Sequence, residues 1–256
     1  MDTSGDPIGA EARPPLTTYE DLAKMIDHSL LRPELSEEQI VDGCDLARSY
    51  NTANVTVRPC DVDSAVRRMQ GSGIAVGTVV GFPHGSTTTA AKLYEARDLV
   101  RRGATEIDAV INIGRLISRQ FQDIETELLQ LSDTCHQQGA ILKVIFENAY
   151  LTHELKVIAC RICKRAGVDY IKTSTGFAPS GYMLEDLHLM RKHGGAMKVK
   201  AAGGVRTLEA ALEVYQAGCS RIGATATAAI LDAWKEHLKR LAAEAQANAQ
   251  QPASNT

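Results

Sequence analysis

Residues 197–226, MKVKAAGGVRTLEAALEVYQAGCSRIGATA, contain one complete strand–helix–strand unit. The apolar runs at Met197–Lys200 and Arg221–Ile222 predict two strands, and Thr207–Gln216 between them has the pattern of an amphipathic helix. This helix begins at a threonine, a common N-cap residue, and Gly218 follows its last turn as a stop signal. A strand, a helix and a second strand in this order predict a parallel sheet with a right-handed crossover.

The same alternation runs along most of the chain. Further strands are predicted at Met25–Leu30, Ala53–Val57, Ile74–Val80, Glu106–Ile111, Ile141–Phe146 and Asp169–Lys172. Helices are predicted between the strands at Ser36–Tyr50, Thr87–Arg102, Asp123–Gln138, His153–Ala166 and Leu184–His193. Eight strands separated by helices over roughly 230 residues fit a single α/β domain, a closed (β/α)8 or TIM barrel. A doubly wound open sheet is the alternative, but no G-x-G-x-x-G motif follows the first strand and no change in composition marks a second domain.

The two ends of the chain differ from the part between them. Residues 1–15 are rich in Gly, Pro and Ala, and residues 245–256, AQANAQQPASNT, are polar without apolar periodicity. We therefore predict flexible tails at 1–15 and 245–256 and a barrel domain over 16–244.

Composition narrows the classes of partner and compartment. The net charge is −3, which argues against a broad nucleic-acid or membrane surface. No apolar run reaches the roughly 18 residues of a membrane span, and the first residues lack the pattern of a secretory signal. Six scattered cysteines fit a reducing compartment, so we expect a cytoplasmic protein. Cys160 and Cys163 form a C-x-x-C inside a helical pattern, and because no second pair lies at metal-ligand spacing we interpret them as buried structural thiols and predict no metal.

Charged side chains occupy the ends of several apolar strands, where the active sites of such barrels lie. Lys172 and Lys200 end two adjacent predicted strands, and Asp27, Asp108 and Lys143 lie on three others. Two neighbouring ammonium groups lower each other's pKa, and burial lowers it further. The result is a neutral amine near physiological pH, the species that attacks a carbonyl to form an imine.

A purely structural interpretation is that each lysine pairs with a carboxylate such as Asp108. We expect such pairing for Lys143, and a reactive role for the lysines at 172 and 200 because of their place at strand ends. Lys198 shares the face of Lys200, but Lys200 lies nearer the end of the strand and is the stronger candidate.

Glycine-rich loops follow three successive strands and predict an anion site. Backbone N–H groups can approach a phosphate closely at glycines, and loops after the seventh and eighth strands form the recurrent phosphate site of TIM barrels. The predicted phosphate-binding residues are Thr175, Gly176, Gly203, Gly204, Gly223, Thr225 and Ala226. The implied ligand is a small phosphorylated sugar.

In these segments the sequence resembles the deoxyribose-phosphate aldolase family of class I aldolases. The resemblance covers about residues 20–235 and rests on IDHSLL (26–31), VGFP (80–83), EID (106–108) with VINIG (110–114), KVI (143–145), KTSTGF (172–177) and VKAAGGVRT (199–207). The last two motifs are highly specific in this order and spacing.

The resemblance implies reversible cleavage of 2-deoxy-D-ribose 5-phosphate to acetaldehyde and D-glyceraldehyde 3-phosphate. Lys172 would form the Schiff base, Lys200 would lower its pKa, and Asp108 would move protons through a water. Supporting or substrate-binding roles would fall to Asp27, Lys143, Thr56 and Thr173. No cofactor or metal is expected, because the iminium takes the part of a Lewis acid.

Three positions depart from the family pattern. A cysteine commonly stands where this chain has Thr56, an aromatic or amide residue where it has Arg58, and a serine where it has Ala226. If that serine acts through its backbone N–H, alanine supplies the same donor. Some members also place a C-terminal tyrosine near the site, whereas the last tyrosine here is Tyr215.

Two other functions remain open from the sequence. One is a related imine-forming aldolase with a different aldehyde, for which the changes at Thr56 and Arg58 would be responsible. The other is a degenerate barrel that only binds a phosphosugar, which the combination of Lys172, Lys200 and Asp108 disfavours because binding requires no reactive amine. The sequence leaves open the oligomeric state, with a homo-oligomer as one possibility, and the physiological direction of the reaction.

Overall fold

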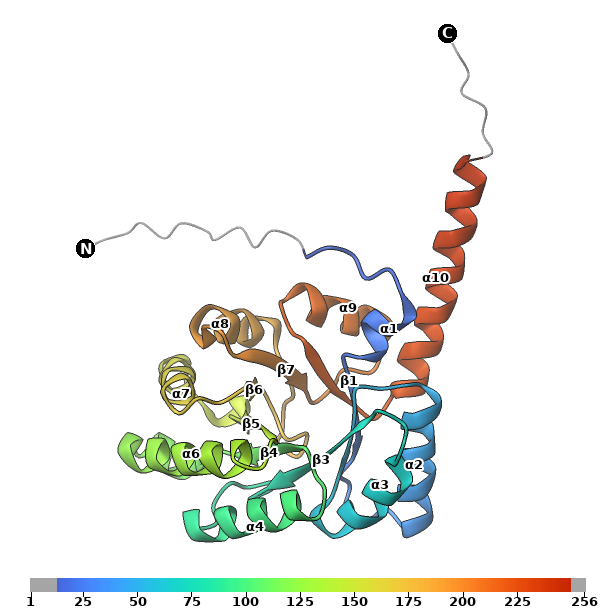
Figure 1. Ribbon diagram of the computed structural model, residues 1–256. Coiled ribbons are helices and arrows are strands. Elements are labelled where there is room, and N and C mark those ends of the chain that lie inside the picture. The colour runs from blue at the N-terminus through green and yellow to red at the C-terminus, as the bar shows by residue number, and fades with distance from the viewer. Residues whose placement is uncertain (1–12, 250–256) are drawn as a thin grey trace, which may run out of the picture.

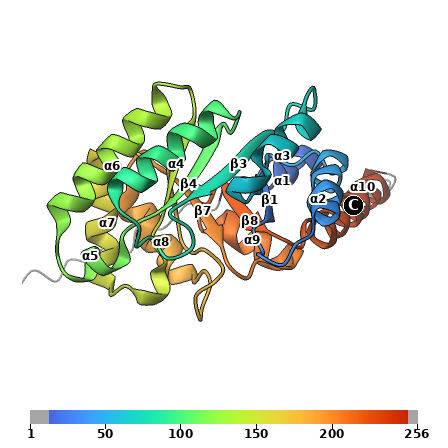
Figure 2. The same cartoon turned by 90° about the horizontal axis from the view of Figure 1, so that it is seen from below.

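The structure is a computed structural model that describes residues 13–249. These residues form a closed barrel of eight parallel strands, paired in chain order from β1 to β8 and back to β1, with helices outside the strands (Figures 1 and 2). The predicted TIM barrel is confirmed. The strands are β1 (Ile26–Leu30), β2 (Asn54–Val57), β3 (Ala75–Val80), β4 (Glu106–Val110), β5 (Ile141–Ile145), β6 (Tyr170–Lys172), β7 (Lys198–Ala202) and β8 (Arg221–Ala224).

The predicted strands and long helices match the structure closely. The six helices expected from periodicity are α2 (Glu37–Ser49), α4 (Thr89–Arg101), α6 (Phe121–His136), α7 (His153–Arg165), α8 (Leu184–Gly194) and α9 (Leu208–Gln216). As expected, Thr207 caps α9, because its side chain accepts a hydrogen bond from the Ala210 N–H. Strand β7 extends two residues beyond its predicted end, to Ala202.

The sequence analysis did not identify several shorter elements. These are α1 (Tyr19–Ala23), α3 (Val62–Met69), α5 (Ile113–Ile117) and the 3-10 turns η1 (Pro59–Asp61) and η2 (Asn148–Tyr150). Elements of three to eight residues are too short to show a helical period, and packing against the barrel stabilises them.

The C-terminal boundary differs from the prediction. Helix α10 (Thr227–Ala249) runs through residue 244, where a flexible tail was expected to begin, and extends past the barrel (Figure 1). Its last turns are rich in alanine, the residue with the strongest helix propensity, so this part stays helical without an apolar stripe. The rest of the predicted tail, 250–256, lies outside the described residues.

The N-terminal boundary also differs. Most of the predicted tail, 1–12, lies outside the described residues, but Arg13 is anchored to the barrel. Its guanidinium donates hydrogen bonds to the carbonyl oxygens of Tyr215 and Cys219 at 3.0 and 2.7 Å. The segment that precedes α1 is therefore fastened to the corner between α9 and β8.

The cysteine pair on α7 is structural, as expected. Cys160 and Cys163 are buried in the hydrophobic core, and burial raises the pKa of the Cys160 thiol to about 12. Within residues 13–249, no group of three or more His, Cys, Asp or Glu side chains is arranged to hold a metal ion. No helix in the same range is long and apolar enough to cross a membrane.

Register brings the charged strand residues to neighbouring levels of the barrel. Lys172 on β6 lies opposite Lys200 on β7, and Asp108 on β4 lies opposite Lys143 on β5. Because alternate residues of a strand share a face, these side chains point into the barrel interior together.

A buried ion pair lies outside the barrel strands, between α4 and α6. The Lys92 ammonium is fully buried and contacts Glu127 Oε1 at 2.6 Å and the carbonyl oxygen of Val110, at the end of β4, at 2.8 Å. The second Glu127 oxygen accepts a hydrogen bond from the Thr89 hydroxyl at 2.9 Å. The pair thus ties α4 and α6 to β4, the strand that carries Asp108.

The Lys92→Met variant should lose about 3 kcal/mol of unfolding free energy, because it leaves the Glu127 carboxylate buried without its cation. Replacing both partners, as Lys92→Met with Glu127→Leu, should recover most of that loss. Urea unfolding measures both values, and Lys235→Met, which removes an exposed ion pair with Asp232, is the control expected to change stability by less than about 1 kcal/mol. A single variant as stable as the parent protein would contradict the assignment.

Candidate active site

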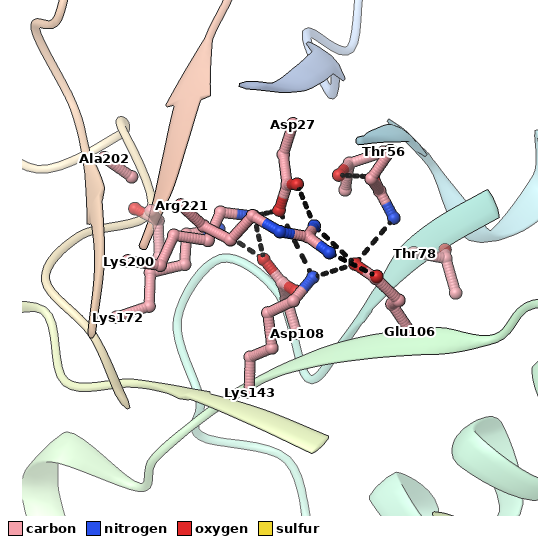
Figure 3. Close-up of polar contacts among 12 residues, drawn as sticks. Asp27, Thr56, Thr78, Glu106, Asp108, Lys143, Lys172, Lys200, Ala202 and Arg221 are labelled. Atoms are coloured by element: carbon pink, nitrogen blue, oxygen red, sulfur yellow. Dashed lines mark hydrogen bonds and ion pairs between the residues drawn. The ribbon is translucent and has the colours of Figure 1, made fainter. Parts of the chain in front are cut away.

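Asp108 lies at the centre of the barrel and receives three lysines. Its Oδ2 is 2.8 Å from Lys172 Nζ and 2.9 Å from Lys200 Nζ, and its Oδ1 is 3.0 Å from Lys143 Nζ (Figure 3). All four side chains are buried. The three candidate catalytic residues, 108, 172 and 200, therefore lie in contact. Lys172 and Lys200 are both paired with the Asp108 carboxylate, as the purely structural interpretation also predicts.

A second group of charges lies deeper in the barrel. Asp27 Oδ2 is 2.5 Å from Lys200 Nζ and 3.3 Å from Lys143 Nζ, and its Oδ1 accepts from the Arg221 guanidinium at 2.5 Å. Glu106 accepts from Lys143 at 2.5 Å and from Arg221 at 3.1 Å (Figure 3). Asp27 and Lys143 thus link the two groups.

The buried network contains one more cation than anions. Asp27, Glu106 and Asp108 are its carboxylates, and Lys143, Lys172, Lys200 and Arg221 are its cations. An uncompensated charge in a low-dielectric interior is costly. Loss of a proton from one lysine therefore brings the network to neutrality.

The pKa shifts indicate which lysine loses that proton. Burial, together with the charges of Lys200 and Lys143, lowers the pKa of Lys172 to about 8, against the opposing effect of Asp108. Burial would lower the pKa of Lys143 too, but Asp108, Asp27 and Glu106 outweigh it and raise that pKa. Lys143 stays an ammonium, whereas Lys172 is partly a neutral amine near pH 8.

The carboxylates of Asp27 and Asp108 remain ionised. Burial alone would raise the pKa of Asp108, but Lys143, Lys172 and Lys200 hold it well below its ordinary value. Burial likewise opposes the combined effect of Lys143, Lys200 and Arg221, which lowers the pKa of Asp27. Both groups are therefore hydrogen-bond and proton acceptors at neutral pH.

Lys172 and Lys200 line a cavity at the carboxyl ends of the strands. Asp27, Thr56 and residues of the glycine-rich loops line the same cavity. Two exposed arginines, Arg32 and Arg206, also line it. The cavity-lining residues among the predicted phosphate binders are Thr175, Gly176, Gly203, Gly204, Gly223 and Thr225.

Steric contacts explain why two positions in this cavity are occupied by glycine. At Gly203 φ is +84°, and a Cβ there would lie 2.9 Å from the Cα of Gly181, which belongs to the loop after β6. At Gly223 a Cβ would lie 3.3 Å from Lys200 Cε, so the glycine leaves room for that side chain. Glycine here permits both the backbone conformation and the close packing.

Two predicted supporting residues do not reach the cavity. The Thr173 hydroxyl donates to the carbonyl oxygen of Ala202 at 3.1 Å and accepts from its N–H at 3.0 Å, so it joins β6 to β7. Lys143 lies below the cavity, where it holds Asp27, Glu106 and Asp108 together. Both act on the site through other residues.

Two predicted phosphate donors are also placed differently. The N–H and the hydroxyl of Thr175 both donate to the Glu147 carboxylate, so Thr175 borders the cavity with its donors already used. Ala226 does not line the cavity, and its carbonyl oxygen accepts the hydrogen bond from Ile230 in the first turn of α10.

The sequence analysis missed Arg221, Glu106 and Asn54 as members of the network. Asn54 donates to Glu106 at 2.8 Å and accepts from the Thr56 hydroxyl at 2.6 Å. A signal was present, because each of the three precedes by two residues a predicted site position on the same strand and so shares its inward face. All three residues begin their strands, whereas the active sites of such barrels are expected at the carboxyl ends of strands.

Two other assignments concern charged residues near the cavity. Lys198 is exposed and lies 5.6 Å from the ring of Tyr170, outside the cavity, which agrees with the choice of Lys200. Arg58 does not line the cavity either: it contacts Asp61 at 2.6 Å and donates to the carbonyl oxygen of Pro33 at 3.0 Å, which holds the loop after β1.

Comparison with known proteins decides the family. Residues 22–236 match the model of the DeoC/LacD family aldolases. The chain belongs to this family. It is 44% identical over 225 residues to the deoxyribose-phosphate aldolase of Bacteroides thetaiotaomicron, which covers 88% of this chain and 94% of the relative. It is 42% identical over 221 residues to that of Rhodopirellula baltica, which covers 86% of this chain and 92% of the relative.

A solved structure of the same family has the same fold. The deoxyribose-phosphate aldolase of Aeropyrum pernix, described as tetrameric, superimposes with a TM-score of 0.81 at 28% identity. The superposition covers 87% of this chain and 94% of that one. The barrel and its aldolase classification therefore rest on both sequence and structure.

Removing the charge of Lys200 should raise the pKa of Lys172 above 8, because one like charge is lost and Asp108 is shared with fewer cations. Competitive labelling with an amine-reactive reagent across pH, followed by peptide mass mapping, measures this pKa in Lys200→Met. The control is Lys198→Met on the same strand, which should leave it unchanged. A Lys172 pKa that falls or stays constant in Lys200→Met would contradict the electrostatic account.

Proposed function

We propose that this aldolase reversibly cleaves 2-deoxy-D-ribose 5-phosphate to acetaldehyde and D-glyceraldehyde 3-phosphate through a Schiff base on Lys172. The observation that carries the proposal is the buried Lys172 amine, whose pKa is lowered to about 8, in a cavity bordered by glycine-rich loops. The names of the relatives at 42–44% identity support the same substrate.

The first stage is formation of the imine. Neutral Lys172 attacks the C1 aldehyde of the open-chain sugar, and the resulting carbinolamine loses its hydroxyl as water. Lys200, 2.9 Å from Asp108, can supply the proton to the departing hydroxyl, and Asp108 accepts protons from the nitrogen. The nitrogen gives up one proton and keeps the other, so the product is a protonated C=N whose positive charge lies beside the Asp108 carboxylate.

Carbon–carbon cleavage follows from the imine. The proton of the C3 hydroxyl passes to the Asp27–Asp108 carboxylate pair, directly or through a water, and the C2–C3 bond breaks. Its electron pair moves into the C=N, which leaves an enamine of acetaldehyde on Lys172 and frees glyceraldehyde 3-phosphate. A proton then adds to the enamine carbon, and hydrolysis of the imine releases acetaldehyde.

The phosphate end of the substrate belongs at the glycine-rich side of the cavity. Gly203 and Gly204 follow β7, Thr225 follows β8, and Arg206 adds a positive charge next to them. Backbone N–H groups and a guanidinium together form the kind of site that binds a dianion. This placement leaves the aldehyde end of the sugar near Lys172.

The compartment and the assembly are part of the same proposal. We infer that the enzyme works in the cytoplasm, where an exposed thiol such as that of Cys60 stays reduced. We also infer a homo-oligomer, supported by the tetrameric relative and by exposed apolar side chains on the outer helices, among them Tyr94 on α4 and Leu129 on α6.

Borohydride reduction in the presence of 2-deoxyribose 5-phosphate should leave a stable adduct on Lys172, because hydride reduces a C=N bond to a secondary amine. Peptide mass mapping locates the adduct. Lys172→Met should abolish it, whereas Lys198→Met, the control on the exposed lysine, should trap as much as the parent enzyme. An adduct on Lys200 would keep imine chemistry but overturn the assigned nucleophile.

Gly203→Ala should raise the KM for 2-deoxyribose 5-phosphate about 10-fold, because a Cβ at φ +84° collides with Gly181 and displaces the loop that receives phosphate. The rate with unphosphorylated 2-deoxyribose should change much less. Steady-state kinetics with both substrates measures the difference.

Gly139→Ala is the matched control for the backbone strain. Gly139 has φ +74° with nothing within 4 Å of an added Cβ, and it lies in the turn before β5, away from the cavity. This variant should lose some stability but keep both KM values. Equal losses with the two substrates in Gly203→Ala would argue against a phosphate role for the loop.

A further inference from the structure

Glu147, two residues after the end of β5, has a backbone conformation that residues other than glycine rarely adopt. Its φ and ψ are 55° and 65°, in the left-handed region. Strand-like hydrogen bonds continue on both sides of it, from the Phe146 N–H to Lys172 O at 2.9 Å and from the Asn148 N–H to Thr173 O at 3.0 Å. A residue other than glycine is strained in this region, and such strain is usually kept where it places a functional group.

The strained residue directs its carboxylate to the loop that follows Lys172. Glu147 is buried and accepts the Thr175 N–H at 3.3 and 3.2 Å and the Thr175 hydroxyl on the same carboxylate. The Thr175 Oγ1 in turn accepts the Phe177 N–H at 3.0 Å. The hydroxyl of Thr175 is thereby held against the carboxylate, with one lone pair left for a second proton.

Thr175 stands between two cavities. It lines the reaction cavity together with Lys172, and it also lines an adjoining cavity that includes Glu147. Ile117 and Tyr150, half-exposed residues, line the outer part of this second cavity, which is therefore open to solvent. Glu147 and Thr175 lie in series between the solvent on that side and the reaction cavity.

The proposed reaction contains a step that such a route can serve. After cleavage the enamine carbon must gain a proton. Asp27 and Asp108, whose pKa values are lowered, are ionised at neutral pH apart from the proton that the C3 hydroxyl passes to them in cleavage, and Lys143, whose pKa is raised, is a weak donor. Burial raises the pKa of Glu147, against the opposing effects of Thr175 and Lys172, so this carboxyl keeps its proton to a higher pH than usual.

We propose that Glu147, acting through the Thr175 hydroxyl, delivers the proton to the enamine carbon and regains it from water in the second cavity. In the step, the Thr175 O–H proton bonds to the enamine carbon with the C=C electron pair, and the nitrogen lone pair re-forms the C=N. The Glu147 proton moves to Thr175 Oγ1, and the carboxylate takes a proton from solvent. In the synthetic direction the same relay removes a methyl proton from the acetaldehyde imine.

This inference rests on the Schiff-base function, and its test separates the two. In Glu147→Gln, borohydride trapping on Lys172 reports the imine, and rapid-quench release of glyceraldehyde 3-phosphate reports carbon–carbon cleavage. Exchange of the acetaldehyde methyl protons for deuterium in D2O, followed by NMR, reports proton transfer at the enamine carbon once trapping has shown that the imine forms. Glutamine keeps the size of the side chain and can still accept the Thr175 hydrogen bonds through its amide oxygen.

The expected result is a split among these readouts. Trapping and a burst of about one equivalent of glyceraldehyde 3-phosphate should match the parent enzyme, whereas methyl exchange and steady-state turnover should fall about 100-fold. Glu147→Asp, which keeps a carboxyl group, should recover part of the exchange. Tyr150→Phe, in the wall of the same second cavity, is the control that should exchange at the parental rate.

Three results would overturn the inference. Unchanged methyl exchange in Glu147→Gln would show that another group protonates the enamine. An equal fall in trapping, burst and exchange would assign Glu147 a structural role only. The melting temperatures of variant and parent enzyme, measured by circular dichroism, would be compared alongside these three readouts. A parent enzyme that traps no adduct would refute the Schiff-base function itself, and the relay with it.

Discussion

The site depends on one constraint: four cations can be buried in the barrel only if carboxylates lie among them. Asp108 and Asp27 meet this need, since between them they contact Lys143, Lys172, Lys200 and Arg221. Burying a charge without such a partner is prohibitive, and one that is paired keeps its ionisation. The carboxylates therefore make the lysine cluster possible, and the single surplus positive charge makes one amine easy to deprotonate.

The charged residues inside the barrel lie in two layers with different roles. Glu106, Arg221, Asn54 and Lys143 form a lower layer that fixes Asp27 and Asp108 from below. Lys172 and Lys200 lie above these carboxylates and face the cavity. This paired lower layer holds the carboxylates that position the Lys172 amine, so the proposed imine formation needs little reorganisation. The glycine-rich loops complete the cavity where backbone groups can reach an anion.

Two charged residues hold loops that border the cavity. The strained Glu147 holds the segment 173–177 by its carboxylate, and Arg58 holds the loop after β1 by its guanidinium. Both residues act on a loop that borders the cavity rather than on the reacting lysine. Arg58 therefore bears on loop position, whereas Thr56 lines the cavity itself.

The sequence by itself determined the barrel and predicted the candidate catalytic residues. Alternating strands and helices indicated the fold, because periodicity and capping are local properties, and the charged residues Lys172, Lys200 and Asp108 within apolar strands predicted the chemistry. Only the tertiary structure decided which polar groups are already satisfied. Thr173 bonds to β7, Thr175 to Glu147, and the guanidinium of Arg221 to a strand distant in sequence. These pairings depend on the register of neighbouring strands and on the path of loops around the barrel, which no local pattern specifies.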